Sequence, residues 1–167
     1  MNVNARFRFA ISLFACLLAW ANPGAADEKG GAEAGWIKDS KGCKISNPNP
    51  KPKESVTWSG PCPKGIADGT GVLQFSVDGK EGARYEGDLK QGVMSGRGKL
   101  KMADGATYDG DWVDGKPDGY GKYIAPNGSS FVGGWTDGQQ DGPGTYRDTE
   151  GGVTTGTWKG GKYVGPQ

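Results

Sequence analysis

The sequence predicts an all-β fold, an elongated array of antiparallel β-hairpin repeats that forms a single twisted sheet or solenoid. Three observations predict it. Glycine accounts for 32 of the 167 residues, well above the usual share of about 7%. Six Trp, six Tyr and five Phe accompany these glycines, whereas disordered segments are poor in aromatic residues. The glycines and aromatics also recur together with a period of 23 residues, which is typical of repeat proteins.

The repeated unit is clearest in three consecutive blocks that open at Tyr85, Tyr108 and Phe131. With the opening residue numbered 0, each block has glycine at positions +2, +7, +11, +13 and +20 and a large apolar residue at +4. An upstream block opens at Trp58, keeps four of these glycines and is four residues longer. A partial block opens at Thr154. The expected blocks are therefore 58–84, 85–107, 108–130, 131–153 and the partial 154–167.

Each block is expected to form two strands. In an extended segment, positions 0, +2 and +4 share one face, which places the aromatics and a glycine together, while the polar positions +1 and +3 face the other way. The second strand is predicted from about position +12 to +17, where Lys99, Leu100, Lys101 and Met102 alternate in polarity. The glycines at +11 and +13 are expected to leave room for aromatic rings. One hairpin is marginally stable alone, so neighbouring blocks must stack.

The joins between blocks carry turn signals. Asp104-Gly105, Asn127-Gly128 and Glu150-Gly151 stand where one block ends and the next begins. Asp-Gly and Asn-Gly are favoured in two-residue hairpin turns. We therefore expect two-residue turns at these joins.

The chain ahead of the repeats divides into three segments. Residues 1–26 resemble a secretory signal peptide: Arg6 and Arg8 precede an apolar run over 9–21, and small residues follow before Asp27. An uncleaved N-terminal anchor is the alternative, although the run is shorter than the ~20 residues of a spanning helix. Residues 27–42 are polar and rich in glycine and alanine, which predicts a flexible linker. Residues 43–57 contain three prolines and are expected to lie, extended, over the first hairpin as an N-terminal cap.

Two cysteines, Cys43 and Cys62, follow the predicted signal peptide. An even pair in an exported chain predicts a disulfide, which would hold the cap to the first repeat. Two free thiols are the alternative, and a metal pair lacks further Cys or His ligands.

Composition disfavours several functions. Histidine is absent, which removes the commonest general base and most zinc sites. A formal net charge of +1 gives no electrostatic case for nucleic acid. No nucleophile elbow, phosphate-binding loop or metal motif is present in the sequence. The sequence therefore predicts no catalytic residue, no metal and no cofactor.

Two sets of residues are candidates for binding. Carboxylates recur beside glycine, as at Asp118 and Asp141, and would hold cations or a basic partner; the alternative is that they only favour turns. An aromatic row would form a stacking platform for sugars or a groove for a peptide; the alternative is that it is the core of the sheet. This row consists of Tyr108, Trp112, Phe131, Trp135 and Trp158.

The block Tyr108-x-Gly110-x-Trp112-x-x-Gly115-x-x-x-Gly119-x-Gly121 resembles the MORN repeat (membrane occupation and recognition nexus). The segment that starts at Cys43 is similar to the lead-in of exported bacterial members. The resemblance implies an elongated, slightly twisted antiparallel sheet and a role in protein or membrane contact. Leu89 at position +4 and Thr154 at position 0 depart from the pattern, as expected for terminal repeats.

Together these observations predict a non-catalytic, periplasmic or secreted scaffold that binds a protein in the cell envelope. The alternative is a module that binds cell-wall glycan or lipid headgroups through exposed aromatics.

Overall fold

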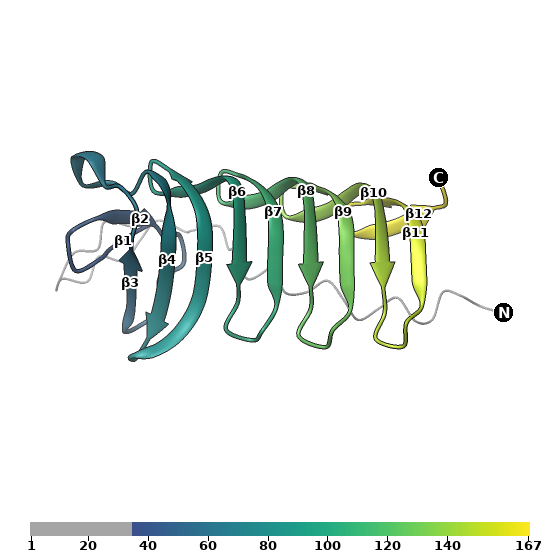
Figure 1. Cartoon of the computed structure of the whole chain (residues 1–167), viewed down its shortest axis with the longest axis horizontal. Helices are drawn as coiled ribbons and strands as arrows, with labels where there is room; N and C mark the ends of the chain where they lie inside the picture. The colour runs from purple at the N-terminus through teal and green to yellow at the C-terminus, as the bar shows by residue number, and fades with distance from the viewer. Residues whose placement is uncertain (1–34) are drawn as a thin grey trace, which may run out of the picture. The chain divides into compact units, whose positions relative to one another are not determined.

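A computed structural model describes residues 35–167, and the predicted signal peptide lies outside the described residues. Ten strands, β3 to β12, form one antiparallel sheet in which each strand pairs with its neighbours in the chain (Figure 1). This confirms the predicted all-β array of hairpins. The strands are β3 (Glu54–Trp58), β4 (Gly69–Val77), β5 (Lys80–Lys90), β6 (Val93–Lys101), β7 (Thr107–Val113), β8 (Lys116–Ile124), β9 (Ser130–Thr136), β10 (Gln139–Arg147), β11 (Val153–Lys159) and β12 (Lys162–Gly165).

In the three blocks that open at Tyr85, Tyr108 and Phe131, the two-residue turns lie inside the block and not at its join to the next. Asp114-Gly115 and Asp137-Gly138 each have positive φ at both residues and connect strands separated only by those two residues. Positive φ at both central residues is the geometry that Asp-Gly turns favour. The second strand of each complete block consequently starts at position +8, as at Lys116, instead of the predicted +12.

The joins at Asp104-Gly105, Asn127-Gly128 and Glu150-Gly151 form longer loops, so the prediction of two-residue turns there was wrong. In the first of these loops, the Met102 amide donates to the Ala106 carbonyl and the Gly105 amide donates to the Met102 carbonyl. The Asp104 carboxylate also accepts the Ala106 amide at 3.0 Å. The aspartate thus stabilises a wider loop.

The upstream block forms a hairpin in the predicted register. Trp58, its opening residue, lies over Gly71, where a Cβ would stand 2.7 Å from the indole. The four extra residues of this block lie ahead of Tyr85, where β5 starts early, at Lys80, and meets β4 at the tight turn Asp78-Gly79.

The segment ahead of the repeats differs from its prediction in two respects. Residues 36–38, assigned to a flexible linker, form β1 (Trp36–Lys38), which pairs with β2 (Lys44–Ser46) as a separate two-stranded sheet. Residues 54–58, assigned to the cap, form β3, the first strand of the large sheet. β1 and β2 form a short hairpin, whereas β3 pairs with the more distant β4, and composition alone revealed neither pairing.

β2 is the part of this segment that covers the first repeats. Its Lys44 carbonyl accepts the Ala67 amide at 3.0 Å, and its Ser46 amide donates to the Gly92 carbonyl at 2.9 Å. Cys43, directly before this strand, forms a disulfide with Cys62, with Cα atoms 6.0 Å apart. A 3-10 turn, η3 (Pro63–Gly65), follows Cys62.

One face of the sheet holds the core. In β7, Tyr108, Gly110 and Trp112 are buried, while Asp109 and Val113 are exposed, which is the predicted alternation. A Cβ at Gly121 (position +13) would overlap the ring of Tyr108, so that glycine makes room for the aromatic as expected. The glycine at +11 has another role: Gly119 has φ of 113° and lies opposite Asp111, in the β-bulge of the hairpin.

Candidate functional site

The predicted aromatic row forms a continuous ladder of edge-to-face rings. Tyr108 lies between Trp112 and Trp135, with ring centroids 5.1 and 5.3 Å away. Phe131 lies in the same way between Trp135 and Trp158, at 5.5 and 5.0 Å. Edge-to-face pairs at these distances add to the stability gained from burial. Trp112 and Trp135 therefore each contact the opening aromatic of their own block and that of the block before it, whereas Trp158 contacts Phe131 of the block before it and Tyr163.

Hydrogen bonds satisfy the polar atoms of the ladder. The Trp112 indole N–H donates to the Gly98 carbonyl at 3.0 Å, and Trp135 donates to Gly121 at 3.1 Å. The Tyr108 hydroxyl donates to the Asp111 carbonyl at 3.1 Å. Burial raises the pKa of the Tyr108 hydroxyl, and the nearby Asp111 carboxylate raises it further. The indole bonds reach the preceding block, so they tie successive repeats together.

The five residues of the predicted binding row are at most 5% exposed. A stacking platform for sugars or a groove for a peptide needs accessible ring faces, and these residues turn theirs toward one another. The structure therefore places the row in the core of the sheet, which was the alternative to a stacking platform or a peptide groove. The role of these five aromatic residues is therefore to stabilise the fold.

The recurrent carboxylates at position +10 bind the backbone of the next repeat. Asp118 accepts the amide of Asp137 at 3.1 Å, and Asp141 accepts that of Gly160 at 3.2 Å. Asp68, in the upstream block, accepts the amide of Gln91 at 3.0 Å. In each case the donor is the first residue of the following tight turn. These carboxylates hold adjacent turns together.

A second set of bonds between repeats was missed by the sequence reasoning. The glycine at +7 of each block donates its amide to the carbonyl at +9 of the block before. Distances are 2.9 Å for Gly115 to Met94 and 2.8 Å for Gly138 to Pro117. Gly92 to Ala67 and Gly161 to Gln140 repeat the contact. The only sequence signal for these bonds is the invariance of glycine at +7 within the chain.

Exposed apolar residues gather toward the C-terminal strands. Tyr120 of β8 is 61% exposed, Val153 of β11 51% and Val164 of β12 61%. Val113 and Tyr163 complete the set of exposed large apolar residues in the described part of the chain. Within residues 35–167, no group of three His, Cys, Asp or Glu side chains is placed to hold a metal ion. None of the helices in the same residues is long and apolar enough to span a membrane.

The MORN repeat model matches residues 85–107, 108–130, 131–153 and 155–166. These matches coincide with the three complete blocks and the partial one, and the strands and core rings recur with them. The chain is a MORN-repeat protein. MORN repeats are non-enzymatic modules that bind proteins or membranes. No curated protein matches the chain.

Proposed function

We propose that the chain is a non-catalytic, exported scaffold that binds a partner protein in the cell envelope. The observation that carries this proposal is the bonding between repeats. Neighbouring blocks are bonded through the turn glycines at +7, the indole N–H groups of Trp112 and Trp135, and the carboxylates at +10. The array therefore displays its solvent-facing side chains at fixed spacings. A surface that is ordered before binding loses little conformational entropy when a partner docks.

The cystine supports the exported location. Disulfides persist in oxidising compartments and are rare in the cytosol. The bond joins the β2 segment, which covers the first repeats, to the loop that leads into β4. An oxidising compartment would therefore hold the N-terminal end of the array closed.

The proposal is tested with the full chain, tagged at its C-terminus and expressed in its source organism. Cells are fractionated, thiols are alkylated without reduction, and proximal proteins are crosslinked and purified with the tag. We expect the chain in the envelope or secreted fraction, with Cys43 and Cys62 unmodified by the alkylating reagent. We also expect one protein to be enriched reproducibly over a tagged, unrelated exported control.

Cytosolic chain with both thiols alkylated would refute the exported location. Enrichment of no protein, together with retention of the purified chain on cell-wall glycan or anionic lipid vesicles, would favour the module that binds an envelope ligand. Aromatic stacking on a sugar responds little to salt, whereas contacts between charged surfaces weaken as ionic strength rises. A salt series on the retained chain therefore separates those two ligands.

A further inference from the structure

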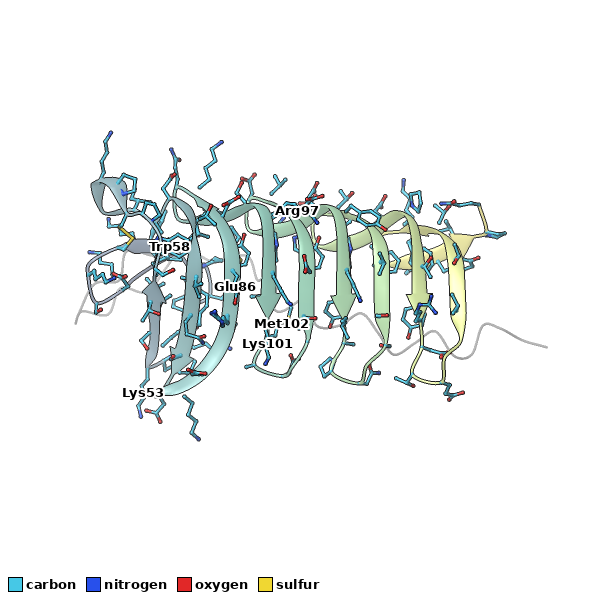
Figure 2. All side chains as sticks on the ribbon, viewed as in Figure 1. Lys53, Trp58, Glu86, Arg97, Lys101 and Met102 are labelled. Carbon is cyan, nitrogen blue, oxygen red and sulfur yellow. A yellow bond between two sulfur atoms is a disulfide. The ribbon has the colours of Figure 1, made fainter. Side chains whose placement is uncertain are left out.

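The outer face of the sheet, opposite the aromatic ladder, changes character along the array. A row of cross-strand partners runs over β5, β6 and β7: Glu86 faces Lys99, and Lys99 faces Asp109. Arg97 faces Asp111 in the next row, with 3.7 Å between the charged groups. Glu86, Arg97 and Lys101 are labelled in Figure 2. Opposite charges alternate across these strands, as on a solvated surface.

The same row becomes uncharged beyond β8. Asp109 faces Lys122, Lys122 faces Val132, Val132 faces Thr145, and Thr145 faces Thr155. The hydroxyls of the two threonines lie 3.0 Å apart and satisfy each other. The adjacent rows contribute Tyr120, Ile124 and Pro143, and they also contain Arg147. We call this surface the neutral face and define it by Tyr120, Ile124, Val132, Pro143, Thr145 and Thr155.

Several residues of the neutral face are open to solvent. Tyr120 is 61% exposed, and its strand partner Gly134 has no side chain to cover the ring. Val153, which borders the neutral face on β11, is 51% exposed. The cores of protein interfaces are depleted of charged residues and enriched in aromatic ones, and contiguous exposed apolar surface marks interaction sites. The charged half of the outer face has neither property.

Two positive charges border the neutral face, while on its β7 side Asp109 faces Lys122 and the Asp111 carboxylate accepts the Tyr120 amide. Lys122 lies at its β8 side, and Arg147 lies between Ser130 and Val153 in the row beside it. No carboxylate among residues 35–167 forms a salt bridge with Arg147. A partner that docks here gains most if it places apolar side chains over Val132 and Tyr120 and a carboxylate toward Arg147.

We propose that the neutral face is the docking surface for the partner protein, and that the partner presents an apolar patch bordered by Asp or Glu. This inference rests on the proposed scaffold function and adds the surface and the partner's chemistry. Two other surfaces of the repeats are already engaged: the inner face packs its rings, and the turn edge binds its own backbone amides. Apart from the bond between Thr145 and Thr155, no hydrogen bond or salt bridge within residues 35–167 is formed by the side chains that define the neutral face.

The first experiment maps contacts by position in living cells of the source organism. The photoreactive residue p-benzoylphenylalanine replaces Val132 or Thr155 on the neutral face. Ser55 or Thr57 is replaced in the controls, because both are exposed on the outer face of β3. We expect adducts to one other protein from the first two positions and none from the controls. The crosslinked peptide of that protein should contain apolar residues and at least one Asp or Glu.

The second experiment measures affinity for the protein identified in those adducts. The variant V132E/T155E places two negative charges on the neutral face, and S55E/T57E adds the same charge to the control region. We expect the first to weaken binding about tenfold or more and the second to leave it unchanged. R147A should weaken binding at low ionic strength and have a smaller effect at high salt. The thermal midpoints of all variants, followed by tryptophan fluorescence, verify folding.

The remaining outcomes separate this inference from the proposed function. Adducts from the β3 positions at equal or greater yield would overturn the docking surface and leave the scaffold function standing. Adducts only to a second copy of this chain would overturn the proposed partner. The absence of any protein adduct from all four positions, with the variants folded, would overturn both the docking surface and the protein-binding function.

Discussion

Substitution of Gly121 by alanine tests whether the aromatic ladder depends on glycine at position +13. A Cβ at residue 121 would meet the hydroxyl oxygen of Tyr108 and stand 2.5 Å from its Cζ atom. Carbon atoms pack at about 3.5–4 Å, so the ring would have to move by about 1 Å. Tyr108 is fully buried between Trp112 and Trp135, which prevents the ring from swinging aside.

The expected cost follows from these contacts. Overpacking a well-packed core costs about 1–3 kcal/mol, and a rigid ring between two indoles places this site near the upper end. Replacing glycine in a strand recovers about 0.5–1 kcal/mol because the unfolded chain loses conformational freedom. The free energy of unfolding should therefore fall by about 2 kcal/mol. For a domain of this size, the thermal midpoint should fall by about 8 °C.

The matched control is Gly82→Ala. Gly82 also lies in a strand without positive φ, and its Cβ would find its nearest atom, the Phe75 carbonyl oxygen, at 3.3 Å. We expect a midpoint within about 2 °C of that of the unmodified chain, because no ring lies in the way. Thermal unfolding of the purified chain, followed by tryptophan fluorescence, measures both. If Gly121→Ala unfolds at or above the temperature of the unmodified chain, the packing of the rings over glycine is refuted.

Three further predictions concern the cystine, the turn carboxylates and the buried tyrosines. The variant C43S/C62S should lose about 3 kcal/mol in urea unfolding, the loop-closure entropy for a separation of 19 residues; an unchanged midpoint would contradict this. Asp118→Ala should lose about 1 kcal/mol through its bond to the Asp137 amide, and Asp109→Ala, without such a bond, less than half of that in the same assay. Burial raises the pKa of Tyr85 and Tyr108, so both stay protonated in the folded state while unfolded tyrosines ionise above about pH 10. Stability should thus be unaffected by these groups below pH 10 and fall above it, by up to about 1.4 kcal/mol per tyrosine per pH unit; urea titrations in which stability stays level to about pH 12 would contradict this.

The period and the two faces of each strand could be predicted from sequence because their causes are local. Tyr108, Gly110 and Trp112 alternate along one strand, and alternation alone assigns them to one face. The turns could not be assigned in the same way. The block 108–130 contains two turn signals, Asp114-Gly115 and Asn127-Gly128, and the tight turn is the one whose glycine amide bonds to the preceding block. That bond spans 21 residues of sequence and leaves no local signature.

The candidate site was harder to predict for a related reason. The sequence shows that Trp112 and Tyr108 share a face, yet whether the rings are accessible depends on how each tryptophan leans over the preceding block. The indole bond from Trp112 to Gly98 settles the orientation, and it joins residues from different repeats. The carboxylate of Asp118 presents the same difficulty, because the amide that it accepts belongs to Asp137, in the tight turn of the next block.

A repeat chain offers an internal comparison that points to its binding surface. Positions 0, +2, +4 and +13 hold the core, so the physics of packing keeps them nearly constant from block to block. The outer position +1 is under no such constraint, and it changes from Glu86 and Asp109 to Val132 and Thr155. Solvation alone would favour charge at every one of these positions, since each faces away from the core. Val and Thr nevertheless fit a pleated strand, so the fold permits the loss of charge in the later blocks, and the proposed docking of an apolar patch would favour it.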